Sequence, residues 1–75
     1  MTIEEVERVV EQLRKHGYSD EQILYSFTNM YLDDKVNFEQ YLALADVLNY
    51  TIKQEIIDAS ESARKIILRN FLSSK

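Results

Sequence analysis

Residues 51–72 have the sequence TIKQEIIDASESARKIILRNFL, and this stretch decides the predicted fold. Apolar and small residues recur in it in steps of three and four, which places them in one row along an α-helix. The row consists of Ile52, Ile56, Ala59, Ala63, Ile66 and Asn70. Because Ile67, Leu68 and Phe71 lie outside the row, the end of the helix is apolar on more than one side. We therefore expect one long helix, capped by Thr51, that packs against two neighbours.

Three shorter helices are predicted before this stretch. Thr2, Ser19 and Asn37 each precede an apolar helical stripe and are followed three residues later by Glu or Gln, the pattern of a capping box. Gly17 and Asn49 suit the left-handed conformation in which many helices end. The sequence predicts an all-α fold, a small four-helix domain with helices over 3–15, 20–32, 38–48 and 52–72, and no strand. A single domain should span residues 1–75.

The inward stripes of these helices define the expected core. It comprises Val6, Val10, Leu13, Ile23, Leu24, Phe27, Leu42, Ala45 and Leu48. Four of the five tyrosines also fall at core or helix-junction positions, namely Tyr18, Tyr31, Tyr41 and Tyr50. A chain of 75 residues is close to the size at which one core is barely sufficient for stability. We therefore expect help from self-association, as a homodimer through the C-terminal helix.

Composition excludes several classes of protein. The chain has no Cys, so disulfides and thiolate chemistry are impossible. It contains no apolar run of membrane-spanning length, and Glu4 and Glu5 stand where a signal peptide would carry basic residues. The net charge of −4 argues against general nucleic-acid binding. Since a helix follows Met1 directly, we expect a complete, small cytoplasmic protein.

Residues suited to catalysis or metal binding are few. The single histidine, His16, falls in the last turn of the first helix, where a cation is favourable, and it has no partner residue for nucleophilic or zinc chemistry. The polar turn around Asp33 and Asp34 lacks the spacing of a calcium-binding loop. One glycine cannot form a phosphate-binding loop. The sequence predicts a protein that is not an enzyme and that needs neither a cofactor nor a metal.

Two groups of residues are candidates for binding a partner. Tyr25 and Asn29 lie outside the apolar stripe of the second helix, and a tyrosine on a surface offers a large, fairly rigid contact area. Ile67, Leu68 and Phe71 form the surplus apolar face of the final helix. We predict that these five side chains bind a protein partner.

Short stretches resemble known families. Residues 13–22, LRKHGYSDEQ, are similar to the opening of Cro-type helix-turn-helix repressors, and residues 37–51 are similar to their closing helices. Between the two, the chain is about ten residues too short to hold the recognition helix that reads DNA. Residues 6–45 also resemble a ubiquitin-associated three-helix domain, with Gly17-Tyr18 in place of its Gly-Phe loop. Residues 32–41 are similar to short helical pieces of phage and Gram-positive accessory proteins. These matches cover only helix-boundary residues and assign no family.

Two functions follow as expectations. The first is a non-catalytic protein–protein interaction module, a small bacterial or mobile-element regulator or inhibitor that binds and occludes a macromolecular partner. Its acidic surface could also imitate nucleic acid. The alternative is a degenerate Cro-like DNA-binding protein that uses Lys53, Arg64 and Arg69. The sequence does not identify the partner or the biological process.

Overall fold

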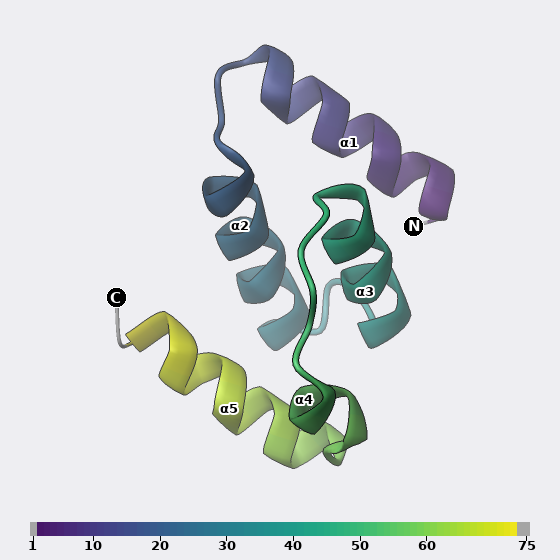
Figure 1. Ribbon diagram of the computed structural model, residues 1–75. Coiled ribbons are helices and arrows are strands. Elements are labelled where there is room, and N and C mark those ends of the chain that lie inside the picture. The colour runs from purple at the N-terminus through teal and green to yellow at the C-terminus, as the bar shows by residue number, and fades with distance from the viewer. Residues whose placement is uncertain (1, 74–75) are drawn as a thin grey trace.

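The computed structural model describes residues 2–73, and all regular structure in this range is helical. Five helices follow one another, so the predicted all-α class is confirmed. Figure 1 shows α1 lying across one end of the molecule, α2 and α3 side by side beneath it, and α4 and α5 at the other end. The bounds are α1 Ile3–Lys15, α2 Asp20–Leu32, α3 Phe38–Val47, α4 Gln54–Asp58 and α5 Glu61–Ser73.

The first three helices begin and end at the signals found in the sequence. In each helix the side chain of the cap residue accepts a hydrogen bond from the backbone N–H three residues later, namely that of Glu5 over 3.2 Å, of Gln22 over 3.2 Å and of Gln40 over 2.8 Å. Each capping box is complete. Gly17 and Asn49 adopt φ angles of 88° and 57°, in the left-handed region. The predicted bounds of the first two helices are confirmed, and α3 ends one residue earlier than expected.

The single long helix expected over 52–72 is wrong. Residues 51–53 are not helical, and the chain breaks again at Ala59 and Ser60 to give the separate helices α4 and α5. Thr51 does not cap a helix, because α4 begins after Lys53, which provides no side-chain cap. Ser60 provides one for α5 instead, accepting a hydrogen bond from the Ala63 N–H over 3.3 Å.

Arg64, on α5, connects the two sides of the break between α4 and α5. Its guanidinium donates to the carbonyl oxygens of Ile56, Ile57 and Ala59, each over 3.0 Å, and so satisfies the carboxyl end of α4. It also donates to the Glu61 carboxylate over 3.0 Å. The guanidinium carbon lies 3.6 Å from the centre of the Phe38 ring, and the residue is only 9% exposed. A heptad count cannot anticipate a bend that a buried arginine holds.

The core lies where α2 and α3 pack together and is closed by α1 and α5. Val6, Val10, Ile23, Leu24, Phe27, Ala45 and Leu48 are buried as predicted. Leu13 and Leu42 are only half-buried, so their assignment to the core is corrected. Leu44 takes that place with no exposed surface. It is buried because α3 packs against α1 and α2 together, which widens the buried arc beyond the single stripe assumed from the sequence.

Aromatic side chains connect the core to the α2–α3 turn. The Tyr31 ring lies 5.7 Å from both the Phe38 and the Tyr41 rings, measured between ring centres. The buried Tyr41 hydroxyl is 2.7 Å from the Thr28 hydroxyl, which also donates to the Leu24 carbonyl. The Tyr31 hydroxyl donates to Glu61 over 2.6 Å. Both tyrosines are therefore buried with their polar ends satisfied, as predicted for core positions.

Because of these two tyrosines, we expect the protein to lose stability at alkaline pH. Burial raises the pKa of Tyr31 and of Tyr41 above the usual value of about 10. The unfolded chain therefore ionises first, so their contribution is complete below about pH 10 and declines above it. Urea unfolding followed by circular dichroism should give a constant midpoint between neutral pH and about pH 9, then a fall. The double variant Tyr31→Phe and Tyr41→Phe should show a shallower fall, and an equally steep one would contradict the assignment.

Candidate interaction groove

A groove lies between α2, α5 and the connection from α3 to α4, residues 48–53. It consists of two adjoining hollows of about 320 and 420 Å³. Leu24, Tyr50 and Phe71 line both hollows, which makes the groove continuous. We call it the α2–α5 groove. Its remaining apolar and aromatic lining consists of Tyr25, Tyr41, Leu48, Ile52, Ile56, Ile67 and Leu68.

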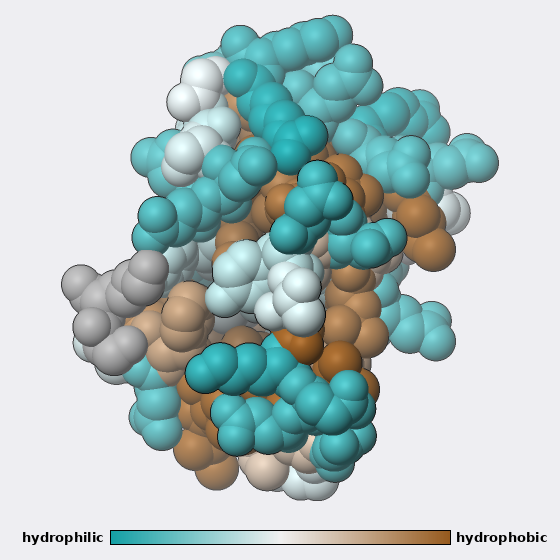
Figure 2. Space-filling model, in the orientation of Figure 1, coloured by the Kyte–Doolittle hydropathy of each residue, from teal (hydrophilic) through white to brown (hydrophobic). Residues whose placement is uncertain are grey.

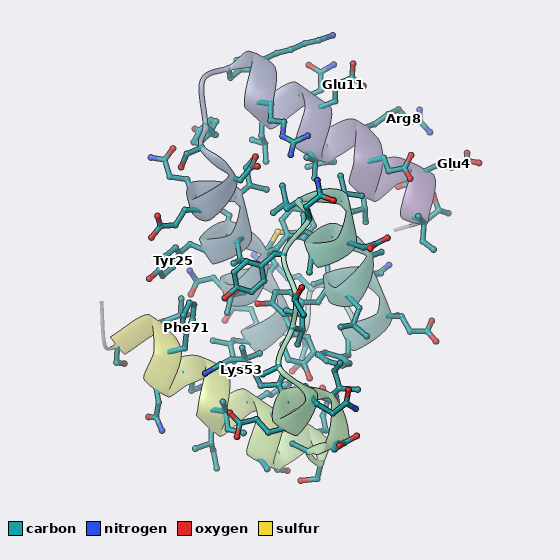
Figure 3. The ribbon with its side chains drawn as sticks, in the orientation of Figure 1. Glu4, Arg8, Glu11, Tyr25, Lys53 and Phe71 are labelled. Carbon is teal, nitrogen blue, oxygen red and sulfur yellow. The ribbon has the colours of Figure 1, made fainter. Side chains whose placement is uncertain are left out.

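Tyr25 and Phe71 line the smaller hollow of the α2–α5 groove from the two helices on its sides. Their rings are stacked, with centres 5.9 Å apart and planes inclined by 18°. Figure 3 shows the two side chains coming from the facing sides of α2 and α5. Both are half-buried, so Tyr25 is not the free surface anchor that the sequence suggested. It helps to hold α5 against α2, because the stacked pair bridges the two helices.

The five predicted partner-binding residues separate into different environments. Leu68 is only 3% exposed and belongs to the core, and the little surface it keeps lines the larger hollow. Ile67 is half-buried and lines the larger hollow with Phe71. Asn29 is exposed outside the groove lining and donates to the Tyr25 carbonyl over 3.2 Å. The structure thus brings Tyr25, Ile67, Leu68 and Phe71 to one groove and excludes Asn29.

Tyr50 is a groove residue that the sequence did not identify. It was expected at a core or helix-junction position, yet it is 46% exposed and lines both hollows. Its N–H donates to the Ala45 carbonyl over 2.8 Å, which closes the end of α3 after the left-handed Asn49. The sequence did contain a hint of this position, because Tyr50 directly follows Asn49, the asparagine expected at the end of the third helix. Its side chain is free of the core because no long helix begins there.

Four charged residues line the α2–α5 groove. Asp20 and Glu21 lie at the smaller hollow, and Lys53 and Glu55 at the larger one. Asp20 is paired with Arg14, which lowers the pKa of the carboxyl group. Figure 2 shows polar residues over α1, at the top of the view, and apolar residues over α5, at its lower left. The lining of the groove is therefore mostly apolar and carries acids at both hollows.

The basic residues that the sequence suggested for contact with DNA are not all accessible. Arg64 is buried and its guanidinium is occupied by three carbonyl groups and Glu61. Lys65, its neighbour, is paired with Asp34. A DNA-binding face needs several cations free to contact phosphates. Lys53 and Arg69 remain exposed, but without Arg64 the proposed set is incomplete.

Within residues 2–73, no group of three or more His, Asp or Glu side chains is arranged to hold a metal ion. None of the helices in this range has the length and apolar character needed to cross a bilayer. Comparison with protein-family models, curated proteins and solved structures found no match to this chain. The resemblances to repressors and to ubiquitin-associated domains therefore gain no support from these comparisons.

Proposed function

We propose that this protein is a non-catalytic protein-interaction module that holds an apolar segment of a partner in the α2–α5 groove. The observation that carries the proposal is the groove itself, two joined hollows lined by aromatic and aliphatic side chains on a very small domain. Pockets lined in this way are the usual places where apolar anchors of a ligand are buried. We further propose that the module is a bacterial or mobile-element regulator or inhibitor, which acts in the cytoplasm by occluding a surface of its partner.

Self-association stays a prediction, with a changed surface. Leu68 is in the core, so a homodimer through α5 would use other apolar residues. Ile66, at 57% exposed, is the most accessible apolar side chain of α5. A dimer formed through Ile66 could still hold a partner in the α2–α5 groove, provided that the dimer interface does not cover the groove. Sedimentation of the unmodified protein measures whether dimers form.

The groove predicts different roles for two tyrosines of nearly equal exposure. Tyr50 lines both hollows, whereas Tyr18, at 49% exposed, lies in the connection between α1 and α2 and lines neither. A peptide selected from a random displayed library on the immobilised protein supplies the ligand. Tyr50→Ala should weaken that peptide by about 1–3 kcal/mol, because it removes a central contact.

Tyr18→Ala is the matched control and should leave peptide affinity unchanged. Both variants should remain folded, since each truncates a largely exposed side chain, and circular dichroism checks this. Isothermal titration measures the affinities. Equal effects of the two substitutions, or a selection that yields no peptide sensitive to Tyr50→Ala, would remove the groove as the binding site.

A further inference from the structure

We propose that the partner segment carries a single carboxylate side chain that pairs with Lys53, while its other contacts with the α2–α5 groove are apolar or basic. This inference rests on the proposed function, because it assigns the chemistry of the segment that the groove receives. It commits to a short segment of another protein as the occupant. The charges that line the groove carry it.

Lys53 is the one cation among the four charged residues that line the groove in the described range. Within residues 2–73 its ammonium makes no hydrogen bond or ion pair, which is also true of Arg8, Lys35 and Arg69, whereas Arg14, Lys15, Arg64 and Lys65 are each paired with an acid. Of the cations without a partner, Lys53 is the one that lines the groove. Figure 3 shows the Lys53 side chain reaching from the connection toward α5, close to Phe71. An exposed ammonium beside an apolar hollow offers a favourable place for an anion.

The three acids that line the groove restrict where a carboxylate of the ligand can bind. Asp20 and Glu21 line the smaller hollow, and Glu55 lines the larger one with Lys53. A carboxylate of the ligand placed near these acids would be repelled, though less at Asp20, whose charge Arg14 offsets, so position as well as charge is specified. An elongated peptide can place one acid at Lys53 and apolar or basic residues elsewhere. A ligand with one anionic head and a plain hydrocarbon tail would use Lys53 but none of the acids.

A charge-reversal selection tests the inference. Random peptides about a dozen residues long are selected in parallel on the unmodified protein and on Lys53→Glu, and are compared by sequence. The unmodified protein should enrich apolar residues with Asp or Glu at one recurring position. Lys53→Glu should enrich Lys or Arg at that position. A synthetic acidic peptide should bind Lys53→Glu about tenfold more weakly, and its Lys-substituted form should recover on the variant.

Arg8→Glu is the control, because it makes the same charge change on the exposed side of α1, which points away from the groove in Figure 3. It should keep the affinity and the sequence preference of the unmodified protein. Identical preferences on the unmodified protein and on Lys53→Glu would overturn the pairing with Lys53. If those peptides still depended on Tyr50, the proposed function would stand without it.

Two other occupants are outcomes of the same experiment. Dodecanoate, an anionic amphiphile, is titrated alongside the peptides, and tighter binding than every selected peptide would overturn the protein-segment assignment. Sedimentation of the unmodified protein would overturn it as well if it showed a dimer that dissociates on addition of the selected peptide. Monomers that bind the acidic peptide and reject its Lys-substituted form are the result expected.

Discussion

Replacing Leu44 with alanine should cost the protein a large part of its stability, whereas the same truncation of Leu42 should cost much less. Leu44 has no exposed surface and lies in the core cluster, while Leu42, two residues away on α3, is half-buried. Removing a fully buried leucine side chain costs about 2–5 kcal/mol, through lost apolar contacts and the cavity that remains. The total free energy of unfolding of a domain of this length is roughly 4–11 kcal/mol.

Leu42→Ala is the matched control, since it has the same chemistry in the same helix. Its cost should fall below that of Leu44→Ala because part of its side chain is already in water. Urea unfolding followed by circular dichroism gives both free energies of unfolding. A larger loss at Leu42 than at Leu44 would mean that the stripe expected from the sequence, rather than the one described, faces the core.

Arg64→Ala should be the second large loss, about 2–4 kcal/mol, although arginine is normally a surface residue. The substitution leaves the carbonyl groups of Ile56, Ile57 and Ala59 without their donor and removes the cation from above the Phe38 ring. Buried or half-buried carbonyl groups without a partner are costly. Helicity of residues 54–58 should fall with the stability, which NMR chemical shifts of the backbone can measure.

Arg64→Lys separates geometry from charge. Lysine keeps the positive charge but has one compact ammonium, which cannot serve three carbonyl groups and Glu61 together. It should therefore recover less than half of the lost stability. Arg69→Ala removes an exposed cation from the same helix and should change stability by no more than about 0.5 kcal/mol. A Lys variant as stable as the unmodified protein would show that charge alone holds the bend.

Local signals in the sequence were sufficient to predict the helix bounds in the first two thirds of the chain. The capping residues Thr2, Ser19 and Asn37 and the left-handed Gly17 and Asn49 determine where the helices begin and end, because these effects act within a few residues. The all-α class followed from the same signals. They describe backbone groups that must be satisfied locally, whatever the rest of the chain does.

The last third could not be predicted in this way. The row from Ile52 to Asn70 is compatible with a straight helix, and the break at Ala59 and Ser60 contains neither Gly nor Pro. What decides the bend is Arg64 reaching back to α4 and across to Phe38, a long-range arrangement that periodicity does not encode. The groove depends on where that bend places α5, which is why only part of its lining could be anticipated.

Few residues of the final third are buried, and we therefore expect the molecule to open in two steps. No residue of α4 is buried, and α5 contributes only Arg64 and Leu68 to the interior. Residues 54–73 can therefore detach in a partial opening while α1, α2 and α3 keep their shared core. Amide hydrogens of α5 should exchange with solvent sooner than those of α3. Since Tyr25 and Phe71 bring α2 and α5 together at the groove, a bound segment would slow exchange along all of α5, including turns that it never contacts.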